Sequence, residues 1–224
     1  YYILLWRTVL CTGVILHSCP NQMSLLFAMK NYTQAEHFYL NHNKFEGTIP
    51  SEVFLLSNLQ FCDISYNFIS GTIPSEIGIS SHRDLVLSSN RLEGTIPDEV
   101  YKNGLDQLQD LKLDHCNLTG TLSTRIGKLS GLQNLHLQNN AFLGRLPSEL
   151  GQLQSLMSIR LNGNDFTGSI PDEMCQLQGP NTLTTAVADC APQEETGAPA
   201  QIDCNMDTCC TSCCEADTGI CVSV

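Results

Sequence analysis

The chain has 224 residues, of which 42% are hydrophobic and 15% are charged. This composition is too apolar for a disordered chain, and the length suits one or two folded domains. The formal net charge of −12 argues against a groove for nucleic-acid phosphates and against a general affinity for anionic membrane surfaces.

Acidic residues and cysteines are concentrated near the C-terminus. All 11 Lys and Arg residues lie at or before Arg160, whereas residues 161–224 hold ten acidic residues and no base. Eight of the 12 cysteines lie at or after Cys175. The last quarter of the chain is therefore chemically distinct from the rest.

The first residue is Tyr1 rather than Met, as expected of a fragment or a mature product. The longest apolar run near the start spans residues 9–16 and follows Arg7. This run is well short of the roughly 20 residues that cross a bilayer, so we expect no membrane insertion by this chain. We interpret it as the core of a first structural unit, with a signal-peptide or anchor remnant as the alternative.

The strongest signal in the sequence is an internal repeat. Four segments share a nearly identical turn, as in NKFEGTIPSEV from Asn43 and NRLEGTIPDEV from Asn90. The anchor residues of the six copies are Asn43, Asn67, Asn90, Cys116, Asn140 and Asn164, with spacings of 24, 23, 26, 24 and 24. A period this regular predicts a solenoid of stacked coils.

Each anchor is preceded by two apolar residues, five and three positions before it. These pairs are Phe38 and Leu40, Cys62 and Ile64, Leu85 and Leu87, Leu111 and Leu113, Leu135 and Leu137, and Ile159 and Leu161. Such alternation predicts a short strand with one buried face. Apolar residues at helical spacing, such as Val53, Leu56 and Leu59, predict a short helical or irregular return.

The pattern LxxLxLxxNxLxGxIPxxLxxL over residues 25–177 resembles the plant-type leucine-rich repeat. The resemblance implies an α/β solenoid: a right-handed superhelix with a parallel concave β-sheet and a short-helical convex side. Because one coil cannot bury its own leucines, neighbouring coils must stack. The repeated Asn can satisfy backbone groups in the turns, and the Gly four residues after each anchor suits a reversal with special dihedral angles.

Departures from the pattern predict local differences. The 23-residue and 26-residue units, the latter containing residues 101–104, should differ on the return side. Cys116 replaces the anchor Asn, and Ser123 replaces the usual Pro. We interpret Cys62 and Cys116 as small buried core residues rather than reactive thiols.

One further degenerate coil is expected over residues 1–24. It places Val14 and Leu16 at the strand positions before Cys19. The family's N-terminal cap, with its Trp and paired cysteines, is represented by Trp6, Cys11 and Cys19, so the resemblance suggests a Cys11–Cys19 disulfide.

Residues 178–224 are expected to form a C-terminal cap and an acidic tail. A last strand is predicted through Leu183, Ala186 and Ala188. Eight cysteines could form four disulfides in 105 possible pairings; they are Cys175, Cys190, Cys204, Cys209, Cys210, Cys213, Cys214 and Cys221. Disulfides are the leading interpretation, and a thiolate zinc cluster or free thiols are the alternatives. Two sequons, at Asn31 and Asn117, predict glycosylation and agree with secretion.

No phosphate-binding glycine loop, HExxH, GxSxG or kinase signature is present. Acidic residues follow each Ile-Pro pair and recur with the coils, as expected of solvated turn residues. Four histidines, His37, His42, His115 and His136, are predicted at concave strand positions, spread over distant coils. We therefore expect no catalytic residue, no metal site among these histidines and no cofactor.

The side chains between the inward leucines form varied columns on the concave sheet. An aromatic patch is predicted toward the N-terminal half, where aromatic residues often anchor a partner. The candidate ligand-binding residues are His37, Tyr39, His42, Phe61, Asp63, Tyr66, Lys112, His136 and Arg160. A solvated sheet with scattered aromatic residues is the alternative.

The leading hypothesis is a non-catalytic extracellular or cell-surface recognition module, similar to receptor-like leucine-rich repeat ectodomains. It would bind a protein, peptide or glycan on the concave face and no nucleic acid. The alternatives are a secreted inhibitor of cell-wall polysaccharide hydrolases and a metal-binding protein using the cysteine-rich tail. The sequence does not define the ligand, the disulfide pairing, the oligomeric state or the presence of an anchor or signalling domain in a longer chain.

Overall fold

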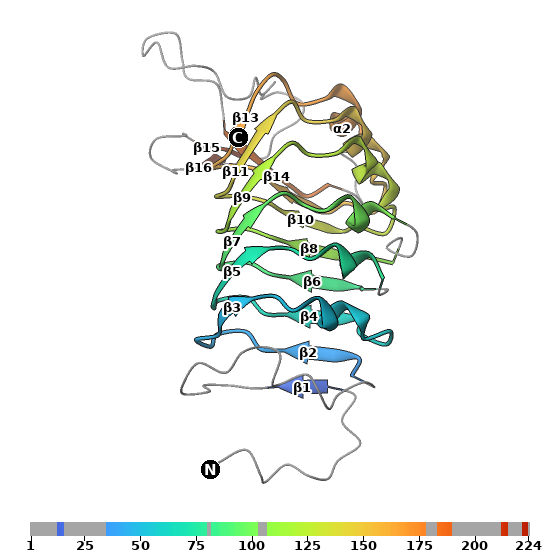
Figure 1. The fold of residues 1–224 in the computed structure, drawn as a ribbon. Helices are drawn as coiled ribbons and strands as arrows, with labels where there is room; N and C mark the ends of the chain where they lie inside the picture. Colours follow the sequence, from blue (N-terminus) through green and yellow to red (C-terminus); the bar gives the residue numbers. More distant parts are fainter. Residues whose placement is uncertain are drawn as a thin grey trace, which may run out of the picture.

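A computed structural model describes residues 13–15, 35–79, 82–102, 107–177, 183–189, 212–214 and 221–223. The chain winds into a solenoid whose coils stack along one axis (Figure 1). Each complete described coil contributes one strand to each of two sheets and then a short helix. The predicted α/β solenoid with parallel strands is confirmed.

The first sheet has ten strands, and consecutive coils supply consecutive strands. Nearly all neighbouring strands are parallel, and only the last pair is antiparallel. The strands are β1 (Gly13–Ile15), β2 (His37–Tyr39), β4 (Phe61–Asp63), β6 (Asp84–Val86), β8 (Asp110–Lys112), β10 (Asn134–His136), β12 (Ser158–Arg160), β14 (Thr185–Asp189), β15 (Ser212–Cys214) and β16 (Cys221–Ser223). We call the surface of this sheet that points away from the core the concave face.

The register of the sheet follows the sequence repeat. One residue per strand lies in a single buried row, in which Phe38 pairs with Cys62, Cys62 with Leu85 and Leu111 with Leu135. Each of these side chains is at most 1% exposed, whereas the strand residues on either side are half-buried. The two-residue alternation predicted from the sequence is therefore the alternation of core and concave face.

The anchor asparagines form a buried ladder that joins neighbouring coils. The Asn90 Nδ2 donates to Leu87 O of its own coil and to Ile64 O of the preceding coil, both at 3.0 Å. Its Oδ1 accepts from Ile69 N, also at 3.0 Å. Asn67, Asn140 and Asn164 make equivalent bonds. The expected role of the repeated Asn is confirmed.

The second sheet lies beside the ladder and has six strands. They are β3 (Glu46–Thr48), β5 (Phe68–Thr72), β7 (Arg91–Gly94), β9 (Asn117–Gly120), β11 (Ala141–Gly144) and β13 (Asp165–Phe166). The repeated Gly at the end of this segment has a positive φ in every coil, for example +79° at Gly94. The special backbone conformation expected of these glycines is thus present.

Short helices return the chain to the next strand of the first sheet. They are the 3-10 helices η1 (Ser51–Leu55), η2 (Ser75–Gly78), η3 (Asp98–Tyr101), η4 (Thr124–Lys128) and η5 (Ser148–Gln152), and the α-helix α2 (Asp172–Cys175). Pro precedes five of the six, where its fixed φ favours helix entry. At the sixth, Ser123 takes this place and its side chain accepts a bond from Arg125 N.

Glycine lets the helices of some neighbouring coils approach closely. A Cβ added at Gly78 would lie 2.5 Å from the carbonyl oxygen of Glu99, on the next helix. At the same repeat position stand Phe54 in the preceding coil and Tyr101 in the following one, and both side chains are buried. Gly78 belongs to the 23-residue unit and Tyr101 to the 26-residue unit, so these two units differ at this position of the return side.

His82 occupies a core position that holds Leu in other coils, such as Leu59 and Leu132. Its side chain is 0% exposed, and neither ring nitrogen has a hydrogen-bond partner among the described residues. The ring lies edge-on to Phe54, with centroids 5.5 Å apart. Burial lowers the pKa of His82 to about 4.

The ends of the sheet extend beyond the six clear repeats. Within the expected first coil the structure describes one strand, β1, which pairs with β2 and aligns Val14 with Phe38. The predicted last strand is confirmed as β14, which aligns Ala186 with Ile159. The sequence did not predict β15 and β16, which continue the same sheet into the cysteine-rich tail.

Candidate functional site

Seven of the nine predicted ligand-binding residues lie on strands of the first sheet. They are His37 and Tyr39 on β2, Phe61 and Asp63 on β4, Lys112 on β8, His136 on β10 and Arg160 on β12. All flank a buried central residue and therefore belong to the concave face.

His42 and His115 do not occupy the predicted strand positions, and the candidate ligand-binding residue Tyr66 lies at the equivalent place in its own coil. Each lies one residue before an anchor, in the turn that follows the strand, with φ of 55°, 54° and 53°. A left-handed turn thus precedes every anchor in the described coils and places these exposed side chains at the edge of the concave face. The strand alternation could not predict this because the turn interrupts the two-residue period.

Aromatic side chains gather where β2 and β4 meet. The rings of His37 and Phe61 stack at 4.5 Å with planes 8° apart, because these residues are paired in the sheet register. Tyr39 lies beside them, with its Oη 3.4 Å from His37 Nδ1. The predicted N-terminal aromatic patch therefore includes a stacked group on the sheet.

A second aromatic pair lies at the neighbouring edge. His42 and Tyr66 stack at 4.2 Å, and Tyr66 is 53% exposed. Beside it, Phe68 on β5 is 40% exposed and carries the Arg91 guanidinium 4.8 Å above its ring. The sequence analysis did not select Phe68 or Arg91, which stand directly after an anchor where other coils carry polar residues or Ala.

Charged side chains occupy the middle of the concave face. Lys112 Nζ donates to Asp110 Oδ2 at 2.7 Å, and Asn134 donates to the other oxygen of the same carboxylate. Asp63 Oδ1 accepts bonds from the backbone and hydroxyl of Ser65. These local partners hold the carboxylates in fixed positions.

Asp84 on β6 differs from its neighbours. It pairs in register with Phe61 on one side and with Asp110 on the other. The described part of the chain supplies no hydrogen bond or ion pair to its carboxylate. Burial and the nearby Asp110 raise the pKa of Asp84. The sequence analysis did not select this residue, which is the least compensated carboxylate of the row.

The same carboxylates act on Tyr39. Burial, followed by the charges of Asp84 and Asp63, raises the pKa of its hydroxyl. On β10, burial and the cationic Arg160 and Lys112 lower the pKa of His136. The two ends of the concave face therefore differ in electrostatic character, with carboxylates near the aromatic group and basic side chains toward β12.

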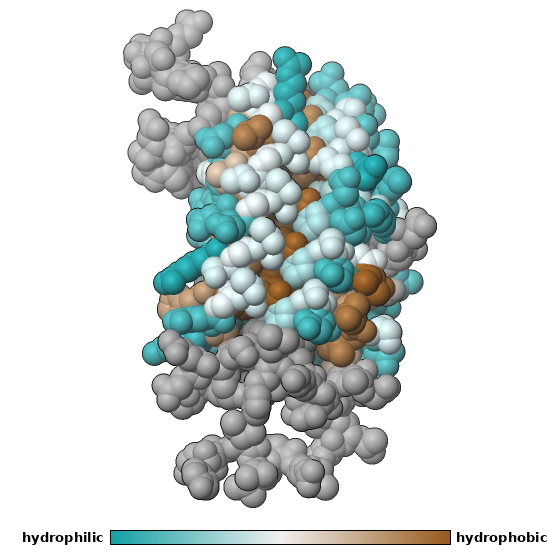
Figure 2. Space-filling view, in the orientation of Figure 1, coloured by the Kyte–Doolittle hydropathy of each residue, from teal (hydrophilic) through white to brown (hydrophobic). Residues whose placement is uncertain are grey.

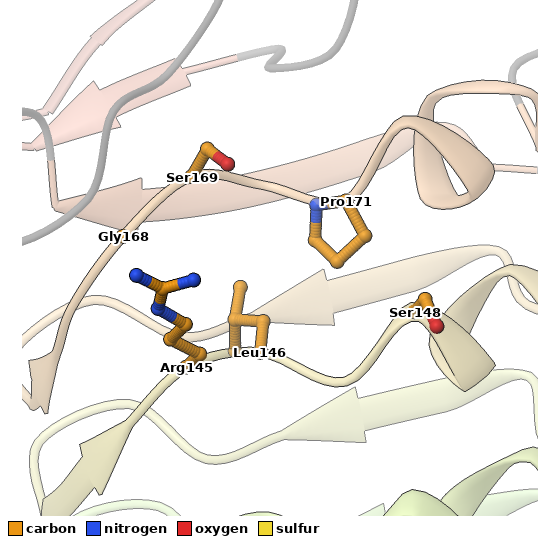
Figure 3. A pocket seen from close by; sticks show the side chains of 6 residues that line it. All are labelled: Arg145, Leu146, Ser148, Gly168, Ser169 and Pro171. Atoms are coloured by element: carbon orange, nitrogen blue, oxygen red, sulfur yellow. The ribbon is translucent and has the colours of Figure 1, made fainter.

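A surface pocket of about 420 Å³ lies between two later coils (Figure 3). Its lining residues are Arg145, Leu146, Ser148, Gly168, Ser169 and Pro171. Arg145 stands where earlier coils have Thr, and a Cβ added at Gly168 would lie 3.3 Å from its Cγ atom. The pocket is separate from the predicted ligand-binding residues, none of which lines it.

The return side carries an apolar region over η1 and η2, visible at the lower right of Figure 2. Leu55 and Ile79 occupy equivalent repeat positions and are 54% and 62% exposed. Later coils hold Lys or Gln at this position, as at Lys128 and Gln152.

The two cysteines inside the repeats are buried, as predicted. Cys62 and Cys116 are both free, and burial raises the pKa of the first thiol to about 12 and of the second to about 11. Cys116 takes the ladder position of Asn, with its Sγ 3.6 Å from Leu87 O. Within the described ranges, no group of three or more His, Cys, Asp or Glu residues could hold a metal ion.

Several predictions lie outside the described residues. These are the Cys11–Cys19 disulfide, the Asn31 sequon and Cys190, Cys204, Cys209 and Cys210. For Cys175, Cys213, Cys214 and Cys221 the structure gives the backbone and not the side chain. Asn117, the other sequon, is exposed at the start of β9.

The leucine-rich repeat family model matches four segments, residues 58–79, 107–129, 131–153 and 155–177. With the repeat, the register and the Asn ladder, these matches show that the chain contains leucine-rich repeats. No curated protein sequence matches the chain.

Solved structures of plant receptors share the fold. The plant peptide hormone receptor RGFR1 in complex with RGF2 is 28% identical with a TM-score of 0.67, over 76% of this chain and 27% of that chain. The ectodomain of GASSHO1/SCHENGEN3 from Arabidopsis thaliana, in complex with CASPARIAN STRIP INTEGRITY FACTOR 2, is 27% identical with a TM-score of 0.69, over 86% and 26%. The Arabidopsis receptor kinase HAESA ectodomain, with an extended IDA peptide hormone, is 28% identical with a TM-score of 0.65, over 85% and 31%. The chain thus spans about a quarter to a third of the length of these receptors.

Proposed function

We propose that the chain is a non-catalytic recognition module that binds a peptide or protein ligand on its concave face. The observation that carries this proposal is the stacked group of His37, Phe61 and Tyr39 on an open parallel sheet. The similar RGFR1 is described as a peptide hormone receptor in complex with RGF2, and the HAESA ectodomain as bound to a peptide hormone, which supports a ligand of this class.

The sheet is suited to recognition because its backbone groups are already paired between coils. A ligand on this face therefore meets side chains rather than free strand edges. Tyr39, Phe61 and His37 offer large, rigid contact surfaces whose ordering costs little conformational entropy, as is typical of interaction anchors. The varied polar side chains around them supply specificity.

An extracellular or cell-surface location forms part of the proposal. It is supported by the ectodomain structures to which the chain is similar. The exposed Asn117 sequon would accept a glycan without displacing core residues, and disulfides in the tail would be stable outside the cell. Among the described residues, no helix is both long and apolar enough to cross a membrane.

Selection from a random peptide library displayed on phage tests the function. Peptides enriched on the full chain should lose binding to the Tyr39→Ala variant and keep binding to Ile79→Ala, whose substitution lies on the return side. Circular dichroism should show that both variants keep the native fold. Enriched peptides that bind Tyr39→Ala as well as the native chain, or a selection that enriches no peptide, would contradict the proposal.

A further inference from the structure

The in-register row of His37, Phe61, Asp84 and Asp110 crosses four strands of the concave face. The residues at both ends of this row have interaction partners within the protein. His37 stacks on Phe61, and Asp110 is bound by Lys112 and Asn134. The centre of the row is the junction between the Phe61 ring and the Asp84 carboxylate.

Phe61 has one ring face available at this junction. The ring is parallel to His37, which covers it from the β2 side, so its other face is directed toward β6. The side chain is half-buried, as is Asp84 beside it. A group placed between them would contact an aromatic face and a carboxylate together.

The charges around the junction define what this group would be. Asp63 lies on the same face, and its Oδ1 is bound by Ser65 while no described residue bonds its Oδ2. Asp84 faces Asp110 across the ladder, and like charges in such a pair oppose folding. Burial and then Asp110 raise the pKa of Asp84, against the opposing charges of Lys112, Arg83 and His37, and burial followed by Asp84 and Asp63 raises the pKa of Tyr39.

We propose that the junction of Phe61, Asp63 and Asp84 is a subsite for a basic side chain of the peptide ligand. A guanidinium or ammonium group would lie over the open face of Phe61 and pair with Asp84, with Asp63 as the second acceptor. Cation–π attraction and charge pairing act together on such a group. This inference rests on the proposed function and adds the chemistry of one ligand position.

The proposal also accounts for the placement of an acidic residue at β6. In the register row, Asn134 and Ser158 occupy the equivalent positions of later strands without a charge. A bound cation would neutralise Asp84 and remove its repulsion with Asp110. The same cation would have no comparable partner at the other end of the face, where His136 and Arg160 lie.

The test is an NMR titration of the full chain with N-acetyl-arginine amide. Its neutral isostere, N-acetyl-citrulline amide, is the control probe. The arginine probe should shift the resonances of Phe61, Asp63 and Asp84 with millimolar affinity that weakens in salt. The citrulline probe should leave these resonances unchanged.

Variants separate the subsite from general attraction to an acidic protein. Asp84→Asn should weaken the arginine probe about fivefold, the size of an exposed charge pair. Asp98→Asn removes the same charge from η3, far along the coil from the sheet, and should leave the affinity unchanged. Asp84→Asn should also unfold at a denaturant concentration no lower than the native chain, which shows that the variant folds.

Equal shifts from both probes, shifts spread over the surface, or an unchanged affinity in Asp84→Asn would overturn the subsite. These results would leave the proposed function standing, because the library selection measures it through Tyr39. Conversely, selected peptides that bind the Tyr39→Ala variant as well as the native chain would contradict the proposed function, even if the arginine probe binds at Asp84.

Discussion

His82 lies edge-on against Phe54 in the core, with ring centroids 5.5 Å apart and both imidazole nitrogens unpartnered among the described residues. Where other coils place an apolar Leu, this coil encloses a titratable ring. Burial lowers its pKa from 6.5 to about 4. We therefore expect low pH to destabilise this coil before the others.

His82 predicts a pH dependence of stability. The unfolded chain binds a proton at pH values below about 6.5, whereas the folded chain resists it until about pH 4. The stability associated with the neutral ring is fully present above pH 6.5 and is lost as the pH falls toward 4, by up to about 3 kcal/mol. Urea unfolding at pH 7 and pH 4.5 measures this difference.

Two substitutions at the same repeat position provide the control. His82→Leu should reduce the loss between pH 7 and 4.5, and Leu132→His should introduce a similar loss in another coil. If His82→Leu retained the full pH dependence of the native chain, the buried ring would not be its cause.

The asparagine ladder predicts a large effect of one amide. Asn90→Ala would leave Ile64 O, Leu87 O and Ile69 N without their side-chain partner in a site where Asn90 is 7% exposed. Buried unsatisfied groups cost about 1–3 kcal/mol each, and partial relaxation should limit the total to about 2–4 kcal/mol. Denaturant unfolding of Asn90→Ala measures it. Asn162→Ala, on the concave face, should change the free energy of unfolding by less than about 1 kcal/mol.

The close contact of neighbouring helices predicts that Gly78 is intolerant of a methyl group. Because an added Cβ would lie 2.5 Å from Glu99 O, Gly78→Ala must push η2 and η3 apart. We expect a loss of about 1–3 kcal/mol, the usual cost of overpacking. Thermal unfolding provides the measurement, and a native-like melting temperature would show that the two helices have more room than the structure gives them.

Burial predicts that the thiols of Cys62 and Cys116 resist alkylation. Their raised pKa values, about 12 and about 11, leave little thiolate at pH 8, and the side chains are 1% and 7% exposed. Mass spectrometry of tryptic peptides after iodoacetamide treatment should find both unmodified in the native chain and modified in urea. Modification at equal rates in both conditions would contradict the buried assignment.

The coil could be predicted from the sequence because stacked coils require apolar residues at a fixed spacing. A residue such as Leu111 can be buried only by equivalent residues in adjacent coils, so its spacing fixes the register. Even the degenerate strand at Val14 followed from counting one period back from the anchor Asn43 to Cys19. The anchors Asn67 and Asn164 similarly defined the hydrogen-bond ladder.

The candidate site was only partly predictable. His37, Tyr39 and Phe61 follow from strand alternation, but the turn positions of His42 and Tyr66 depend on a left-handed backbone that alternation does not encode. Residues such as Asp84 and Phe68 acquire their significance from neighbours one coil away, so only the register shows which charge or ring they face.

The central claim is that the aromatic part of the concave face contacts the ligand. A photoreactive p-benzoylphenylalanine at position 61 tests it directly, with the same residue at position 79 on the return side as the comparison. A peptide enriched in the library selection should cross-link through position 61 and not through position 79. Cross-linking through position 79 alone would contradict the account.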